Sequence, residues 1–180
     1  VCLEKITSEI NMKEVSYADV KVIFGSTTGC TEAAANIIAA NFGTTAINVA
    51  NAAPADFQAD LLILGTSTWG VGDLQDDWFA GVQMLDGIDL KGKKAAVFAM
   101  GDQCGFADSY VDSMRTLADK LEERGAALIG KTSSAGYTHT ASTADQDGFF
   151  CGLALDDTNE PDKTADRIAK WCDQLRAEMK

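Results

Sequence analysis

A turn rich in glycine and hydroxyl side chains follows the first apolar run of the chain. Residues 25–31 read GSTTGCT and lead directly into a segment with helical periodicity. Because the start of a helix offers free backbone N–H groups and the positive end of its dipole, this turn can bind an anion such as a phosphate. It contains no Lys or Arg, so its donors are neutral. The P-loop sequence GK[ST] and the dinucleotide fingerprint GxGxxG are absent, and an ordinary capped turn is the alternative interpretation.

Two later loops each combine glycines and polar groups with one aromatic side chain. Trp69 lies between glycines in the segment 65–74, and Phe106 lies in the segment 101–109. Either ring alone is compatible with packing against the domain. Together, on neighbouring loops beside an anion-binding turn, they favour a site that holds a flat ring between two aromatics, with its phosphate on residues 25–31.

Each of these loops follows a short apolar run, and helical segments separate the runs. We predict strands at Val20–Phe24, Ala46–Val49, Leu61–Leu64, Ala95–Ala99 and Ala126–Gly130, and helices at about residues 31–41, 76–85, 109–124 and from Pro161 onward. Apolar runs without polar alternation are typical of strands buried on both faces of a parallel sheet. The alternation of strands and helices therefore predicts a doubly wound α/β fold, whose ligands bind at the carboxyl ends of the strands.

The last predicted strand is interrupted. A polar segment at about residues 131–147, rich in Ser, Thr and Gly, follows Ala126–Gly130, and a second strand-like run at Gly148–Leu155 comes after it. We interpret this pattern as one strand split by an inserted loop rather than as a separate domain.

The charge and the cysteines limit the classes of partner and site. The net charge of −12 over 180 residues disfavours nucleic acids and anionic membranes and favours partners with a basic docking surface. Five scattered cysteines without a CxxC argue against a disulfide framework and a metal site. No apolar run is long enough to cross a membrane, and the N-terminus lacks a signal-peptide core. We expect a cytoplasmic monomer, with residues 1–16 as an extension and residues 17–180 as one domain.

From about Val20 onward the chain resembles the long-chain flavodoxins. The matching stretches are IFGSTTGCTE (23–32), LILGTSTWGVGDL (62–74), MGDQCGFADSYVDSM (100–114), the pair Gly136-Tyr137, GFFCGLALDDTN (148–159) and TADRIAKW (164–171). The resemblance implies a flavodoxin-like three-layer sandwich with a five-stranded parallel sheet in the order 2-1-3-4-5. It also implies a low-potential one-electron carrier with non-covalently bound FMN, which is not an enzyme and exchanges electrons with a reductase and a low-potential acceptor.

The same resemblance implies roles for particular residues. The phosphate loop is matched by Ser26, Thr27, Thr28, Gly29, Cys30 and Thr31. The family's loop that lines one face of the flavin ring is matched by Thr68, Trp69, Gly70, Val71 and Gly72. The loop that lines the other face is matched by Met100, Gly101, Asp102, Phe106 and Ser109. Asp156 falls near the flavin-side end of the last strand. No residue is assigned to catalysis or to a metal.

The sequence departs from the family pattern at three of these positions. Phe106 stands where long-chain members usually have Tyr, so stacking is kept and a phenol hydrogen bond is lost. Ser67 stands where Pro is common, which predicts a less rigid loop. Cys30 stands where a basic or hydroxyl residue is often found.

Two other functions are compatible with this topology. A flavodoxin-like NAD(P)H:quinone reductase would share the fold and the flavin, but the sequence offers no nicotinamide-binding loop, and we expect the single histidine, His139, to be a solvated surface residue. A signalling receiver domain would need an acidic cluster directly after the first strand, where this chain has hydroxyl side chains at residues 26–28.

Overall fold

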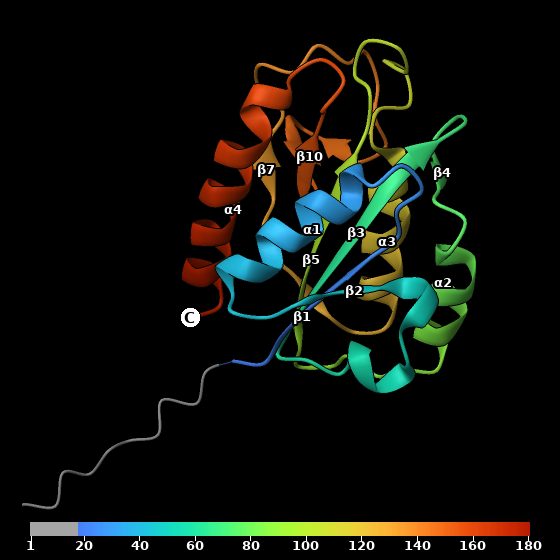
Figure 1. Ribbon diagram of the computed structural model, residues 1–180, viewed down its shortest axis with the longest axis vertical. Helices are drawn as coiled ribbons and strands as arrows, with labels where there is room; N and C mark the ends of the chain where they lie inside the picture. The colour runs from blue at the N-terminus through green and yellow to red at the C-terminus, as the bar shows by residue number, and fades with distance from the viewer. Residues whose placement is uncertain (1–17) are drawn as a thin grey trace, which may run out of the picture.

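The computed structural model describes residues 18–180 and contains a parallel sheet with helices on both faces (Figure 1). The strands follow the spatial order β10-β5-β3-β1-β2, with every neighbouring pair parallel. They are β1 (Val20–Phe24), β2 (Ala46–Asn48), β3 (Leu61–Trp69), β5 (Lys94–Met100) and β10 (Leu153–Leu155). When these five strands are numbered 1 to 5 along the chain, the order read from the β2 edge is 2-1-3-4-5, which confirms the predicted fold class. The predicted extension at residues 1–16 lies outside the described residues.

Two layers of helices bury the two faces of the sheet. Helices α1 (Cys30–Asn41) and α4 (Thr164–Glu178) cover one face, and α2 (Trp78–Asp86) and α3 (Asp112–Glu123) cover the other (Figure 1). Within β3, Leu61 and Ile63 pack into the core on the α1 side, while Leu62 and Leu64 pack into the core on the α3 side. Because both faces are covered here, residues 61–64 are apolar at every position.

The last position of the sheet is shared by two short strands. Strand β6 (Ala127–Leu128) pairs with the start of β5, and β10 pairs with its end. Between them, β7 (Thr132–Ser133), β8 (Asp145–Gln146) and β9 (Phe149–Phe150) form a small antiparallel sheet in the order β7-β9-β8. The split strand is therefore confirmed, but the run at 148–155 is not continuous, since its first half pairs inside the insertion.

Gly152 explains why the chain can return from the insertion to the main sheet. A Cβ atom at this position would lie 2.0 Å from the carbonyl oxygen of Val97. Only glycine allows the backbone to approach β5 this closely.

Other predicted boundaries shift by a few residues. Strand β3 extends to Trp69 because the short strand β4 (Asp73–Leu74) pairs with its end. Helix α3 begins at Asp112, because residues 102–111 are used in turns. Three 3₁₀ segments complete the described elements, at Val49–Asn51, Pro54–Phe57 and Pro161–Lys163. Within residues 18–180, no helix combines the length and the apolar character needed to cross a membrane.

Candidate functional site

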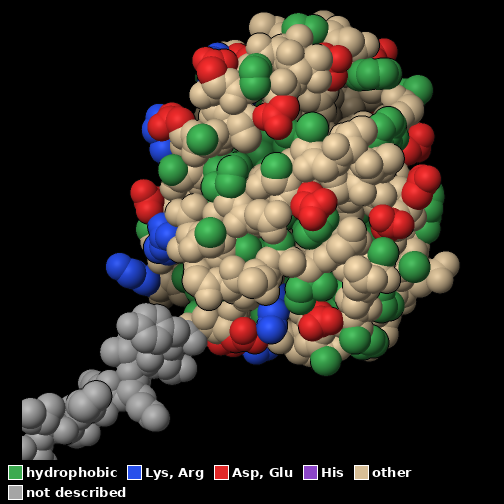
Figure 2. Space-filling model, viewed as in Figure 1, with side chains coloured by type: hydrophobic (Ala, Val, Ile, Leu, Met, Phe, Trp, Pro, Cys, Tyr) green, Lys and Arg blue, Asp and Glu red, His purple; other side chains and the backbone are tan. Residues whose placement is uncertain are grey.

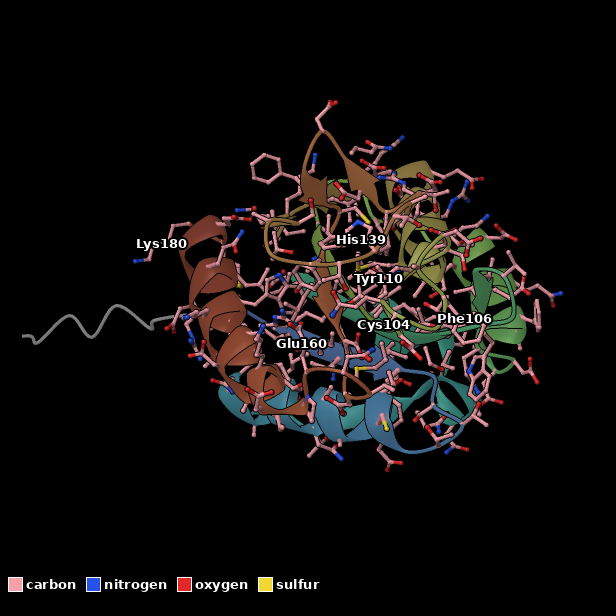
Figure 3. All side chains as sticks on the ribbon, turned by 90° about the horizontal axis from the view of Figure 1, so that it is seen from above. Cys104, Phe106, Tyr110, His139, Glu160 and Lys180 are labelled. Carbon is pink, nitrogen blue, oxygen red and sulfur yellow. The ribbon has the colours of Figure 1, made fainter. Side chains whose placement is uncertain are left out.

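A cleft of about 220 Å³ lies at the carboxyl edge of the sheet, the edge that Figure 3 shows from above. Ten of the predicted site residues line it: Thr28, Cys30, Thr31, Thr68, Trp69, Gly70, Met100, Gly101, Asp102 and Phe106. Ser67, Asp157 and Thr158 also line it and were not predicted. The three loops singled out in the sequence therefore meet at one place.

One end of the cleft is built from the start of α1. Gly29 has a positive φ of 93°, and its N–H donates to the Ser26 hydroxyl at 3.1 Å, which shapes the turn before the helix. The backbone N–H groups of the first helical turn have no intrahelical acceptor. No Lys or Arg of residues 18–180 lines the cleft. This end can therefore bind an anion through neutral donors and the helix dipole.

Thr31 provides a direct test of whether this end fits a ligand. Its side chain is 1% exposed, and its hydroxyl has no hydrogen-bond partner among the described residues, although Thr31 lines the cleft. A buried hydroxyl without a partner is destabilising by about 1–3 kcal/mol. An acceptor oxygen placed at the start of α1 would remove that penalty, as the phosphate of FMN would do.

Trp69 lines the cleft from the end of β3, not from a loop after the strand as the sequence predicted. It pairs with Asp73 of β4, and its indole N–H donates to the Ser67 hydroxyl at 2.8 Å. Ser67 itself pairs with Met100 inside the sheet. Serine at this position thus anchors the Trp69 ring, where the sequence predicted a looser loop.

Gly70 and Gly72 make the turn that lets β4 fold back beside Trp69. Both adopt positive φ angles, of 55° and 94°, which favour glycine over other residues. Val71 lies at the tip of this turn and is 83% exposed. Val71 and Gly72 do not line the cleft and support the Trp69 wall through the turn geometry.

Phe106 lines the same cleft from the loop between β5 and α3 and is labelled in Figure 3. The Asp102 carboxylate folds this loop by accepting hydrogen bonds from the N–H groups of Cys104, at 3.0 Å, and Gly105, at 2.7 Å. The Gly105 bond, with a further bond from Asn159, lowers the pKa of Asp102. Asp102 therefore stays ionised and holds the loop that presents Phe106.

Asp156 supports the loops from below and does not line the cleft. Its fully buried carboxylate accepts hydrogen bonds from the backbone N–H of Gln103 at 3.0 Å, of Thr158 at 3.1 Å and of Asn159 at 2.9 Å. It therefore fixes two loops of the site at once. Ser109 and Thr27 do not line the cleft either: Ser109 is buried beneath the Phe106 loop, and the hydroxyl of the exposed Thr27 accepts from Gln75 at 3.3 Å.

The insertion braces the Phe106 loop, a role that the sequence did not reveal. The backbone N–H groups of Thr140 and Ala141 both donate to the Ala107 carbonyl, at 2.7 and 3.0 Å. The buried amide of Gln103 accepts from the Thr138 N–H at 2.7 Å. These are tertiary contacts between distant segments, so no local pattern could have predicted them.

His139 is part of this brace, and the prediction that it is a solvated surface residue is wrong. Its side chain is 8% exposed, and its Nε2 lies 3.0 Å from an oxygen of Asp145. Its ring packs 5.4 Å from Tyr110 and 5.2 Å from Phe150, centroid to centroid. Figure 3 shows His139 and Tyr110 close to each other. The small antiparallel sheet therefore buries His139 rather than presenting it to solvent.

Glu160 links the brace to α4, and its contacts lead us to expect that it stabilises the fold in a way that is lost in acid. Its carboxylate accepts hydrogen bonds from Lys163, from Arg167 at 2.7 Å and from Gln103 at 3.1 Å. Lys163, followed by Arg167 and Gln103, lowers the pKa of Glu160 from 4.5 to about 2. A carboxyl whose pKa is lower in the folded state stabilises the protein above its unfolded pKa, and this contribution is lost as the pH falls from 4.5 towards 2.

Glu160→Gln should therefore make the free energy of unfolding less dependent on pH over this acid range. Urea unfolding at several pH values measures the slope, and the exposed Glu32→Gln variant serves as the matched control. A slope for Glu160→Gln equal to that of the unmodified protein would contradict this role.

The comparisons with known proteins agree with this geometry. The family model described as Flavodoxin matches residues 22–171. The chain belongs to the flavodoxin family. A flavodoxin of Picosynechococcus is 42% identical over 160 residues, covering 86% of this chain and 94% of the relative, and Flavodoxin 1 of Escherichia coli is 39% identical over 164 residues, covering 88% and 93%. A crystal structure of Fusobacterium nucleatum flavodoxin bound to flavin mononucleotide has a TM-score of 0.85 at 28% identity and covers 91% of this chain and 99% of that one. Flavodoxins are electron-transfer proteins rather than enzymes.

Proposed function

We propose that this flavodoxin binds one FMN non-covalently in the cleft and carries single electrons between redox enzymes. The observation that carries the proposal is the unpartnered Thr31 hydroxyl, which lies at an anion-binding helix start in the same cleft as two exposed aromatic rings. A flat ring that bears a phosphate at one end matches this combination of donors and walls. The FMN named in the Fusobacterium nucleatum structure is such a molecule.

In the bound state we assign the phosphate to residues 26–31 and the ring to the space between Trp69 and Phe106. Thr68 is held by a 2.6 Å hydrogen bond to Ser113 of α3, so this wall is tied to the helix behind it. Met100 and Gly101 form the floor at the end of β5. Val71, Gly72, Ser109 and Asp156 support these walls from outside the cleft. We assign residues 17–180 to a single FMN-binding domain.

FMN supplies reversible redox chemistry at its ring, and the chain's residues set the surroundings of that ring. The Asp102 and Asp157 carboxylates line the cleft, and no Lys or Arg within the described part of the chain does. Negative charge is therefore disfavoured on a group bound there, because like charges repel more strongly away from bulk water. This arrangement favours a low reduction potential.

The distribution of charge over the surface also suggests the chemistry of its partners. Figure 2 shows Asp and Glu side chains across the face of the molecule, with Lys and Arg mainly at its lower and left margins. Together with the net charge of −12, this distribution favours redox proteins whose docking surface is basic. A reductase would deliver electrons, and a low-potential enzyme would accept them.

A spectroscopic titration tests the proposed function. Purified apoprotein should take up one equivalent of FMN. After stepwise reduction, reoxidation should restore the starting spectrum of the FMN-loaded protein. Electron exchange with NADPH should then require a separate reductase. Failure to bind FMN would contradict the proposal, and so would steady turnover of NADPH and a quinone without a reductase.

A further inference from the structure

Cys30 differs from the other cysteines of residues 18–180 in its position. It is the first residue of α1, it is exposed, and it lines the cleft. Cys151 and Cys172 are buried, and burial raises the pKa of each thiol to about 11. Cys104 is exposed but does not line the cleft, and its Sγ lies 3.9 Å from the Thr138 hydroxyl. Among these four thiols, Cys30 alone can meet a molecule bound in the cleft.

A second observation connects this position with an anionic ligand. Thr31, the next residue, also lines the cleft, and its almost fully buried hydroxyl group has no hydrogen-bond partner among the described residues. The first N–H groups of α1 add further donors there. A reagent that carries carboxylates can therefore place one of them on these donors while its reactive bond lies beside the Cys30 sulfur.

We propose that Cys30 is a modification site, open only while FMN is absent, for small disulfides that carry carboxylate groups. The competition with FMN rests on the function proposed above. The Cys30 thiol loses its proton to solvent, and its sulfur attacks one sulfur of the disulfide. The S–S bond of the reagent breaks, a new S–S bond to Cys30 forms, and the other half leaves as a thiolate. The Cys30 sulfur is oxidised, and the leaving half is reduced.

Modification and FMN binding exclude each other because both occupy the start of α1. The adduct fills the space assigned to the phosphate, so the modified protein cannot take up FMN until a thiol reduces the new disulfide. For the same reason, Cys30 can react only in the fraction of the protein that holds no FMN. The cleft would thereby couple the thiol redox state of the surroundings to the amount of flavin-loaded carrier.

The carboxylates of the cleft limit where such a reagent can lie. Asp102 and Asp157 line the cleft, and Glu32 lies in the first turn of α1. They repel an anionic reagent, so any selectivity for one must come from the N–H groups and the Thr31 hydroxyl. Comparison of an anionic with a neutral disulfide therefore tests this donor set directly.

The experiment measures glutathione disulfide adducts at Cys30 and at Cys104 by peptide mass mapping, in apoprotein and in FMN-loaded protein. FMN at about 100 times its Kd should slow adduct formation at Cys30 by about 100-fold, because only the unoccupied fraction reacts. Formation at Cys104 should change little, which makes it the internal control. Inorganic phosphate alone should also slow adduct formation at Cys30. The neutral reagent bis(2-hydroxyethyl) disulfide should give a lower ratio of Cys30 to Cys104 modification than the anionic glutathione disulfide.

The readouts separate this inference from the proposed function. Treated protein should lose FMN uptake and regain it with dithiothreitol, whereas Cys30→Ser protein should keep its own level of FMN uptake after treatment. Normal FMN uptake by untreated protein, combined with equal Cys30 modification with and without FMN, would overturn the inference and leave the proposed function standing. Absence of FMN uptake by untreated protein would overturn the proposed function, and protection of Cys30 by phosphate would then still report anion binding at α1.

Discussion

Replacing Trp69 with alanine is expected to raise the dissociation constant of FMN by about 5- to 150-fold. Stacking of a flat base on one aromatic side chain contributes about 1–3 kcal/mol, and tenfold in affinity corresponds to about 1.4 kcal/mol. Trp69 is suited to this contribution because β4 and the Ser67 hydroxyl already hold its ring in place. Little conformational freedom is therefore lost when a ligand binds against it.

Titration of FMN fluorescence with apoprotein measures this constant without relying on the removed tryptophan. Phe79→Ala is the matched control, because Phe79 is an exposed aromatic residue of α2 that does not line the cleft. It should bind FMN as the unmodified protein does. An unchanged affinity in Trp69→Ala would show that the indole is not a wall of the flavin site.

Replacing Thr31 with valine is expected to change affinity and stability in opposite directions. A hydrogen bond to a charged group contributes about 1.5–3 kcal/mol, so loss of the hydroxyl should weaken FMN binding by about 10- to 150-fold. The apoprotein should become more stable by up to about 1 kcal/mol, because the substitution removes a buried hydroxyl that has no partner in the described structure. The opposite signs are diagnostic, since a variant that only disturbs folding would lose both.

Urea unfolding of the apoprotein and FMN titration together check this prediction. Thr116→Val, at an exposed position of α3, controls for the general effect of the substitution on a helix. A Thr31→Val protein with full affinity would mean that the phosphate does not reach this hydroxyl. A less stable apoprotein would mean that Thr31 has a structural role that its contacts do not reveal.

Thr31 also illustrates how a binding site limits the stability of its own protein. The residue is buried as a core residue would be, yet its polar group has no partner within the described chain. Binding energy offsets this cost only when an acceptor arrives. Sites of this kind are where local stability and function conflict, so stabilising substitutions there are expected to reduce binding.

The sequence predicted the fold because both of its main signals are local. Apolar runs such as Leu61–Leu64 indicate strands that are buried on both faces of a sheet, and the positions of turns indicate where the helices begin. The fold then brings the carboxyl ends of parallel strands to one edge, so residues 25–31, Trp69 and Phe106 could be expected to meet. Thr28, Cys30 and Thr31 of that turn do line one cleft with Trp69 and Phe106.

The tertiary structure alone decided how these residues are held. Asp156 and Gln103 form buried polar contacts between segments far apart in the chain, and the insertion joins the same network. His139 became buried because the small antiparallel sheet packs beside Tyr110. Periodicity reports only which face of an element is apolar, whereas a buried hydrogen bond depends on partners that the complete fold brings together. The sequence thus determined what the site contains, and the packing determined which residues line it and which support it from beneath.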